Sequence, residues 1–207
     1  MATVATIIQN ARYDLGDFGG QKYDDTMMLH YLNRIIPILD DVLISLDADY
    51  TKTSASVTLL SGNNTVALPT RCDNIIMIWY GTDLWLKETL DQLMYRYQIN
   101  ASTSNTGTPQ YWSYNSANIY FNTDADTDYA LTVYFHQRTD TLASDDDMPY
   151  NDVFNEYIRE AIVTMAQKAK DNKIAGPDQQ FYATFKAIAE RYVITRNTRF
   201  RNFHIDF

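Results

Sequence analysis

The chain has 207 residues, of which 45% are hydrophobic and 21% charged, and this is enough to build a substantial hydrophobic core. Its net charge is −9, which disfavours general nucleic-acid binding, because affinity for phosphate comes from lysine and arginine. The single cysteine, Cys72, excludes an internal disulfide, and the longest apolar run, Ile75 to Tyr80, is too short to span a membrane, so we expect a soluble protein made in a cytoplasm.

Two helices are predicted in the first 52 residues. Residues 3–15 carry apolar side chains at helical spacing, and glycines in the stretch 16–20 end that helix. A second helix, 24–47, begins at aspartates that suit a helix N-terminus. Pro37 lies inside its apolar pattern, so we expect a kink there.

The apolar period changes to two after residue 51, which predicts strands. Residues 56–60 and 65–68 flank a Ser-Gly-Asn-Asn turn and are predicted to pair as a β-hairpin. Thr89 and Gln92 form a capping-box pattern that predicts a short helix over about 89–99. Further strands are predicted at 75–80, 110–114, 118–121 and 129–135.

Helical periodicity returns at 151–171 and again at 178–195, with a Gly-Pro break between these segments. The predicted helices and strands together indicate an α+β fold that is mainly α. Because short connections between helices favour antiparallel neighbours, we expect the long helices to pack as a bundle. Segments 1–52 and 149–195 would form an antiparallel helical bundle. A large β-rich insertion, 53–148, would lie between the second and third long helices.

The C-terminal segment, residues 196–207, is predicted to be an extended docking tail. It has no helical period, yet it contains three arginines and three phenylalanines, and a tail that buries nothing gains nothing from aromatic residues. Residues 191–207 carry a net charge of +3 on an otherwise acidic chain. We therefore expect the tail to bind an acidic protein surface with apolar pockets, through Arg196, Arg199, Phe200, Arg201, Phe203, Ile205 and Phe207.

No pattern in the sequence identifies a catalytic, metal or cofactor site. The three histidines are scattered, and no nucleophile elbow, P-loop or dinucleotide fingerprint is present. Asp124, Asp126 and Asp128 match the first positions of a calcium loop, but Tyr129 and Phe135 replace its glycine and its bidentate glutamate, which favours an acidic turn. A pair of carboxylates for glycoside hydrolysis stays open as an alternative.

The β-rich insertion is also rich in aromatic residues, which leaves a sugar-binding surface as an alternative to a sheet with aromatic faces. The residues concerned are Tyr111, Trp112, Tyr114, Tyr120, Tyr129 and Tyr134.

Four stretches, taken in order and spacing, resemble the head-to-tail adaptor (connector, or head completion) proteins of tailed bacteriophages. They are the opening 11–33, with Leu15-Gly-Asp17 and Leu32-Asn33; Leu68-Pro69 before an apolar strand; 106–135, with its strands; and the acidic lead into a long helix at 145–171.

The resemblance implies a structural protein of the virion neck, without enzymatic activity, assembled in the host cytoplasm. Members of that family form twelve-fold rings under the portal and send a C-terminal segment against it. The implied partners are the portal protein, other copies of the chain, tail or nozzle proteins, and double-stranded DNA that passes through the lumen without specific binding; no membrane partner is implied. The alternatives are a carbohydrate- or receptor-binding module built on the β-rich insertion and, less favoured, a cell-wall glycosidase.

Overall fold

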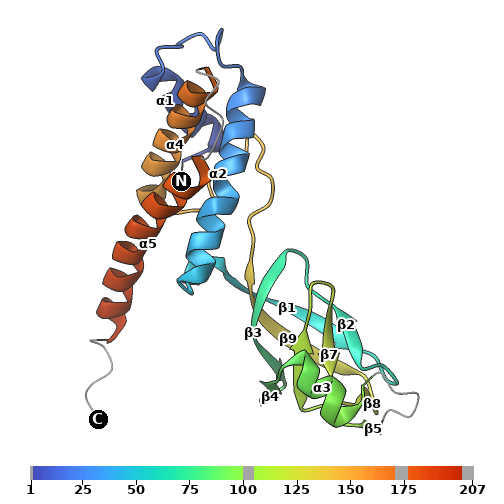
Figure 1. Cartoon of the computed structure of the whole chain (residues 1–207). Coiled ribbons are helices and arrows are strands. Elements are labelled where there is room, and N and C mark those ends of the chain that lie inside the picture. The colour runs from blue at the N-terminus through green and yellow to red at the C-terminus, as the bar shows by residue number, and fades with distance from the viewer. Residues whose placement is uncertain (1, 100–104, 171–176, 202–207) are drawn as a thin grey trace. The chain divides into compact units, whose positions relative to one another are not determined.

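The computed structural model describes residues 2–99, 105–170 and 177–201. The chain forms two compact units (Figure 1). The helical unit comprises residues 1–51 and 139–207, and the β-rich unit comprises residues 52–138.

The helical unit contains four α-helices and one short 3-10 helix among its described residues. Their bounds are α1, Val4–Asp14; α2, Asp25–Ser45; η1, Asp49–Thr51; α4, Asp152–Lys170; and α5, Pro177–Arg201. The side chains of Thr3 and Asp24 accept backbone N–H bonds at the starts of α1 and α2, as expected of N-caps. No helix in the described ranges is both long and apolar enough to cross a membrane.

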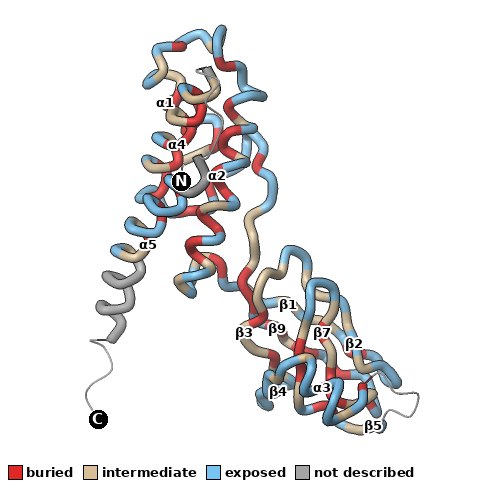
Figure 2. Tube along the Cα trace, in the orientation of Figure 1, coloured by how far each residue is buried: buried red, intermediate tan, exposed pale blue. Residues whose placement is uncertain are grey.

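One hydrophobic core serves all four α-helices of this unit. Buried residues recur every three or four positions on each helix, so one face of each helix turns inward, as Figure 2 shows. The connecting segment after the β-rich unit contributes Leu142, Met148 and Tyr150 to the same core. The largest fully buried side chains of the unit are Met28, Leu32, Ile35, Ile36, Leu39, Leu43, Phe154 and Phe185.

The β-rich unit is built on a seven-stranded mixed sheet with the order β1-β9-β3-β4-β6-β7-β2. Its neighbours pair antiparallel, except for the parallel pair β4 and β6. A short parallel pair, β5 with β8, and helix α3 complete the described part of the unit. The bounds are β1, Lys52–Leu59; β2, Thr65–Ala67; β3, Cys72–Tyr80; β4, Asp83–Lys87; α3, Leu90–Tyr97; β5, Thr106–Gly107; β6, Tyr111–Tyr114; β7, Asn118–Phe121; β8, Asp124–Ala125; and β9, Tyr129–Gln137.

Aromatic side chains fill the core of the β-rich unit. Trp85 packs edge-on against Phe121 and Tyr129, with ring centroids 5.5 and 5.6 Å apart. The indole N–H of Trp112 donates to the backbone carbonyl of Trp85 at 2.8 Å, so this buried donor is satisfied.

The prediction of a mainly helical bundle with an inserted segment is wrong. The large, nearly closed mixed sheet forms a β-rich domain with a hydrophobic core of its own. The predicted hairpin is also wrong, since β1 pairs with β9 and β2 pairs with β7. The physical reason is that apolar alternation identifies a strand, whereas its partner is set by residues far away in sequence.

The prediction of an extended tail from residue 196 is wrong as far as the structure describes the tail. Helix α5 continues to Arg201. The segment 178–201 contains no glycine or proline, so no residue there forces the helix to end. Residues 202–207 lie outside the described ranges.

Candidate functional site

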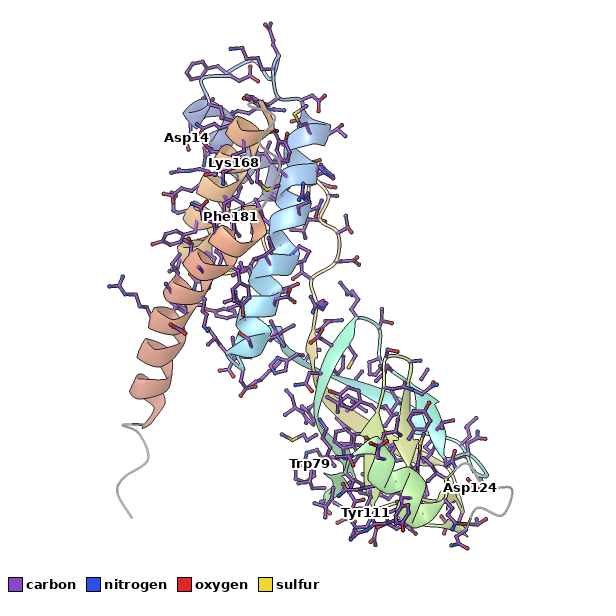
Figure 3. The ribbon with its side chains drawn as sticks, viewed as in Figure 1. Asp14, Trp79, Tyr111, Asp124, Lys168 and Phe181 are labelled. Carbon is purple, nitrogen blue, oxygen red and sulfur yellow. The ribbon has the colours of Figure 1, made fainter. Side chains whose placement is uncertain are left out.

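Helix α5 joins the C-terminal segment to the helical core. Phe181, Phe185 and Ala189 are buried and spaced by four residues, which fixes one face of the helix on the core. At its N-terminal end the Lys168 Nζ of α4 lies 5.9 Å from the centre of the Phe181 ring, and Figure 3 shows both side chains.

Tyr192 is the last partly buried aromatic residue of α5 whose side chain is described. Its ring centroid lies 5.8 Å from that of Phe154 and 5.9 Å from that of Tyr50. Its hydroxyl accepts a hydrogen bond from the side-chain amide of Asn151 at 3.0 Å. These contacts fix the helix one turn before the predicted docking residues begin.

Four of the predicted docking residues lie on the last two turns of α5: Arg196, Arg199, Phe200 and Arg201. Positions 196, 199 and 200 are spaced by three and four residues, which places them on one side of a helix. The other three, Phe203, Ile205 and Phe207, lie outside the described residues. Their role in docking stays a prediction.

Asp17 organises the connection between α1 and α2. Its carboxylate accepts three backbone N–H bonds, from Gln21, Lys22 and Tyr23, at 2.8 to 3.0 Å. Arg12 closes the same loop by donating to the Tyr23 carbonyl at 2.9 Å. Burial raises the pKa of Asp17, but the three backbone donors and the positive charge of Arg12 outweigh burial and lower the pKa overall.

This arrangement predicts an acid-dependent loss of stability. Because the folded pKa of Asp17 lies below its ordinary value of 3.8, the ionised carboxylate stabilises the fold above that pH, and the contribution disappears as pH falls through the folded pKa. Asp17→Asn should lower the thermal midpoint at pH 7, and the two curves should converge as the pH falls below 3.8 and the carboxylate becomes protonated. Thermal melts from pH 2 to 7 test this, with the exposed Asp145→Asn as control. If the thermal midpoints of the natural protein and Asp17→Asn still differ at the lowest pH, the ionised carboxylate is not the cause of the added stability.

Asn33 holds the segment that returns from the β-rich unit. Its amide Nδ2 donates to the Leu142 carbonyl at 3.0 Å, and its Oδ1 accepts from the Leu142 N–H at 2.9 Å. Further along the same segment, the carbonyls of Ser144 and Asp146 accept the N–H groups of Ala5 and Val4. The segment is therefore clamped between α2 and the start of α1.

Asp40 forms a buried polar clasp with Thr139 and Tyr150. Its carboxylate accepts from the Thr139 N–H at 2.8 Å, the Thr139 hydroxyl at 3.1 Å and the Tyr150 hydroxyl at 2.7 Å. Asp40 is only 2% exposed. Burial raises the pKa of Tyr150, and the negative charge of Asp40 raises it further, so the phenol keeps the proton that it donates.

Three groups that the sequence singled out, Cys72, Asp126 and Asp128, interact with neighbouring residues of the protein itself. Burial and the nearby Asp73 raise the pKa of the Cys72 thiol to about 11, so it is protonated at neutral pH and is a poor nucleophile. In the acidic turn, Asp126 accepts from the Tyr129 hydroxyl, and Asp128 accepts from the Ser61 N–H. Within the described ranges, no three acidic, histidine or cysteine side chains gather as metal ligands would.

The aromatic residues predicted in the β-rich insertion do not share one surface. Trp112 and Tyr129 are buried in the core, whereas Tyr134 is 41% exposed on the other face of the sheet. Tyr111 stacks on Tyr97 of α3, with ring centroids 5.7 Å apart. Strand β4 was not predicted, although Leu84-Trp85-Leu86 is a short apolar run of a kind found in strands; in the structure only Trp85 of this strand is buried.

The polar clusters of the helical unit, around Asp17, Asn33 and Asp40, bind the protein's own backbone and side chains. The described residues form two separate hydrophobic cores, one in each unit.

The model of the SU10 adaptor protein family matches residues 2–203, and the chain therefore belongs to this family of phage adaptors. The protein is a structural adaptor and a component of the virion, where it assembles with other virion proteins. The predicted resemblance to phage adaptors is confirmed at this level, and membership of a structural family fits a protein that is not an enzyme. No curated protein matches the sequence.

Proposed function

We propose that copies of this adaptor form a ring of twelve beneath the portal of a phage head. The ring extends the DNA channel and offers the surface to which tail or nozzle proteins attach. The C-terminal segment, residues 196–207, docks each copy onto the portal. The place of action is the neck of the virion, at the junction of head and tail.

The observation that carries this proposal is the charge and composition of the segment that follows the core of the helical unit. After Tyr192 the chain has three arginines and three phenylalanines within residues 196–207. Arginine makes bidentate contacts to carboxylates, and buried aromatic residues often dominate interface energetics. Such a segment suits an acidic protein surface with apolar pockets, and α5 gives it a rigid base.

The acidic remainder of the chain supports the proposed channel. Outside residues 191–207, the net charge is −12. Negative side chains repel the phosphates of DNA, so a lumen lined by this protein would let the duplex slide without binding it. Double-stranded DNA is therefore proposed to pass through the ring rather than to be held by it.

Removal of the C-terminal segment tests the docking step. A chain that ends at Thr195 should bind the portal protein of the same phage at least about 100-fold more weakly, since it loses the proposed arginine and aromatic anchors. The helical unit should stay folded, because its described core residues all precede the cut. Surface plasmon resonance on immobilised portal rings measures the affinity, and circular dichroism checks the fold.

A matched pair of full-length variants separates charge from chain length. Arg196→Gln combined with Arg199→Gln should weaken portal binding and reduce its salt dependence, whereas Lys186→Gln, on an earlier turn of α5, should leave both unchanged. Undiminished binding of the truncated chain would overturn the docking proposal.

A further inference from the structure

The connection between α1 and α2 exposes aromatic side chains on a backbone that the protein holds firmly. Phe18, at its tip, is 76% exposed, and its ring centroid lies 5.4 Å from that of Tyr13, which is 48% exposed. The carboxylate of Asp17 accepts three backbone N–H bonds from the far side of the loop, and the Gly20 N–H donates to the Asp17 carbonyl at 3.2 Å. Phe18 is therefore an apolar side chain that a closed loop presents to solvent.

Two glycines allow the loop to close in this way. Gly16 and Gly20 have φ angles of +67° and +63°, which other residues adopt only with strain. A Cβ at Gly20 would also lie 3.2 Å from the guanidinium carbon of Arg12, the residue that bonds to the Tyr23 carbonyl. A loop that is fixed before it binds loses little conformational entropy on binding, so this loop is suited to present an anchor to a partner.

An apolar groove opens beside the same loop, between the start of α2 and the end of α4. Its volume is about 360 Å³, within the range of binding sites. Its described lining residues are Lys22, Tyr23, Met27, Tyr31, Ala166 and Ala169. Phe18 and Lys22 are four residues apart, so their Cα atoms lie within about 14 Å of each other. One partner is therefore able to contact both the exposed ring and the groove.

The lining of the groove indicates the chemistry of its occupant. Lys22 is the one charged residue among the six, and its side chain is exposed. The neighbouring charge of Arg12 is already paired with Asp25 at 2.7 Å. Apolar walls favour an apolar side chain, and the lysine at the rim favours a negative charge close to it. An apolar side chain next to a carboxylate fits both.

The loop and the groove lie at the opposite end of the helical unit from the proposed docking residues, as Figure 1 shows. Near the groove, the Lys168 Nζ of α4 donates to the Gln180 side chain of α5 at 3.1 Å. At the other end of α4, Asn151 donates to the Tyr192 hydroxyl of α5. The two helices are therefore antiparallel, and α5 spans about 31 Å from Gln180 to Arg201.

We propose that the α1–α2 loop and its groove bind the tail or nozzle protein that attaches to the adaptor. Phe18 would enter an apolar pocket of that protein, and an apolar side chain next to a carboxylate of the same protein would enter the groove beside Lys22. An adaptor joins two different proteins, and about 30 Å of helix separates this surface from the segment assigned to the portal. The inference rests on the proposed function, which supplies the tail-side partner.

Assembly of phage particles with a variant adaptor tests this inference. The full chain with Phe18→Ser and Lys22→Glu is supplied during infection by a phage that lacks a functional adaptor gene, and particles that contain the portal protein are purified. Quantitative mass spectrometry measures the ratio of tail or nozzle proteins to portal protein. The double variant should lower this ratio at least about tenfold, since it removes the apolar anchor and reverses the charge. The ratio of adaptor to portal should stay at its natural value.

A matched double variant keeps the chemistry of both positions. Phe18→Leu with Lys22→Arg retains an apolar side chain and a positive charge, so the ratio should stay within about twofold of the natural value. Both positions are exposed, so neither double variant should unfold the helical unit. Thermal melts followed by circular dichroism check this before the particles are compared.

A photocrosslinker at the tip of the loop identifies the occupant directly. Phe18→p-benzoylphenylalanine, in complete particles exposed to ultraviolet light, should form an adduct with a tail or nozzle protein. An adduct with the portal protein or with a second copy of the adaptor overturns the inference.

The remaining outcomes separate this inference from the proposed function. Natural amounts of tail or nozzle proteins on the Phe18→Ser, Lys22→Glu particles overturn the inference and leave the portal docking intact. Loss of the adaptor itself from those particles also overturns it, because the loop would then serve attachment to the head. If the chain that ends at Thr195 stays on the heads in natural amounts, the docking proposal fails, whereas the inference about the loop is decided by the double variant alone.

Discussion

Replacement of Asp40 by alanine is expected to lower the free energy of unfolding of the helical unit by about 3 kcal/mol. The carboxylate accepts two hydrogen bonds from Thr139 and one from Tyr150, and it is almost fully buried. Alanine leaves these donors without their carboxylate acceptor, with Tyr150 buried and Thr139 partly buried, and each buried unsatisfied group costs about 1–3 kcal/mol. The effect should exceed that of Tyr150→Phe, which removes a single donor and should cost about 1 kcal/mol.

The distribution of tryptophans lets the two units be measured apart. All three tryptophans lie in the β-rich unit, so fluorescence reports that unit, whereas circular dichroism at 222 nm reports mainly the helices. In urea titrations of Asp40→Ala, the dichroism midpoint should move to lower urea and the fluorescence midpoint should move less. The control is Asp145→Ala, at an exposed position. Equal dichroism midpoints for the two variants would show that the clasp contributes no stability.

Local sequence patterns were sufficient to place the helices and most of the longer strands. The N-cap at Asp24 and the capping box of Thr89 with Gln92 are both formed, because such caps depend only on neighbouring residues. Helical periodicity identified α2 and α4 to within a few residues. The apolar run at 75–80 became the second half of β3.

Strand pairing could not be obtained in the same way. The turn between β1 and β2 has the composition of a hairpin, yet β1 gains eight paired residues by pairing with β9 instead. The paired residues lie 70 to 84 positions apart in the chain, and nothing near β1 encodes this partner. The end of α5 was also predicted too early, because the prediction relied on apolar periodicity. Loss of that periodicity shows where a helix no longer packs on the core, whereas the end of the helix itself is indicated by a helix-breaking or capping residue.

The polar residues that hold the helical unit together were only partly visible in the sequence. Asp17 and Asn33 belong to motifs that carried the resemblance to phage adaptors, and the structure gives both a physical role, in a loop and in a clamp. Asp40 had no signal of its own, because its partners Thr139 and Tyr150 are about a hundred residues away. A helical aspartate at such a position looks like any solvated charge until its partners are known.

Phe154→Ala is expected to have the largest effect on the helical unit, about 3–5 kcal/mol. The ring is fully buried and makes edge contacts with Tyr50 and Tyr150 at 6.2 and 6.4 Å between centroids, besides its contact with Tyr192 of α5. Alanine removes the apolar ring and leaves a cavity that this ring of aromatic neighbours can fill only in part.

The same substitution should loosen the base of the C-terminal segment. Tyr192 loses one of its two aromatic neighbours, so backbone amides in the last turns of α5 should exchange hydrogen for deuterium faster than in the natural protein. Val153→Ala is the matched control, because Val153 is the preceding residue of α4 and is 42% exposed, and it should change stability by less than about 0.5 kcal/mol. Loss of stability without faster exchange at the end of α5 would show that Phe154 supports the core but does not hold the C-terminal segment in place. Faster exchange accompanied by weaker portal binding would connect the packing of this one ring to docking, since the proposed anchors depend on the helix that Tyr192 fixes.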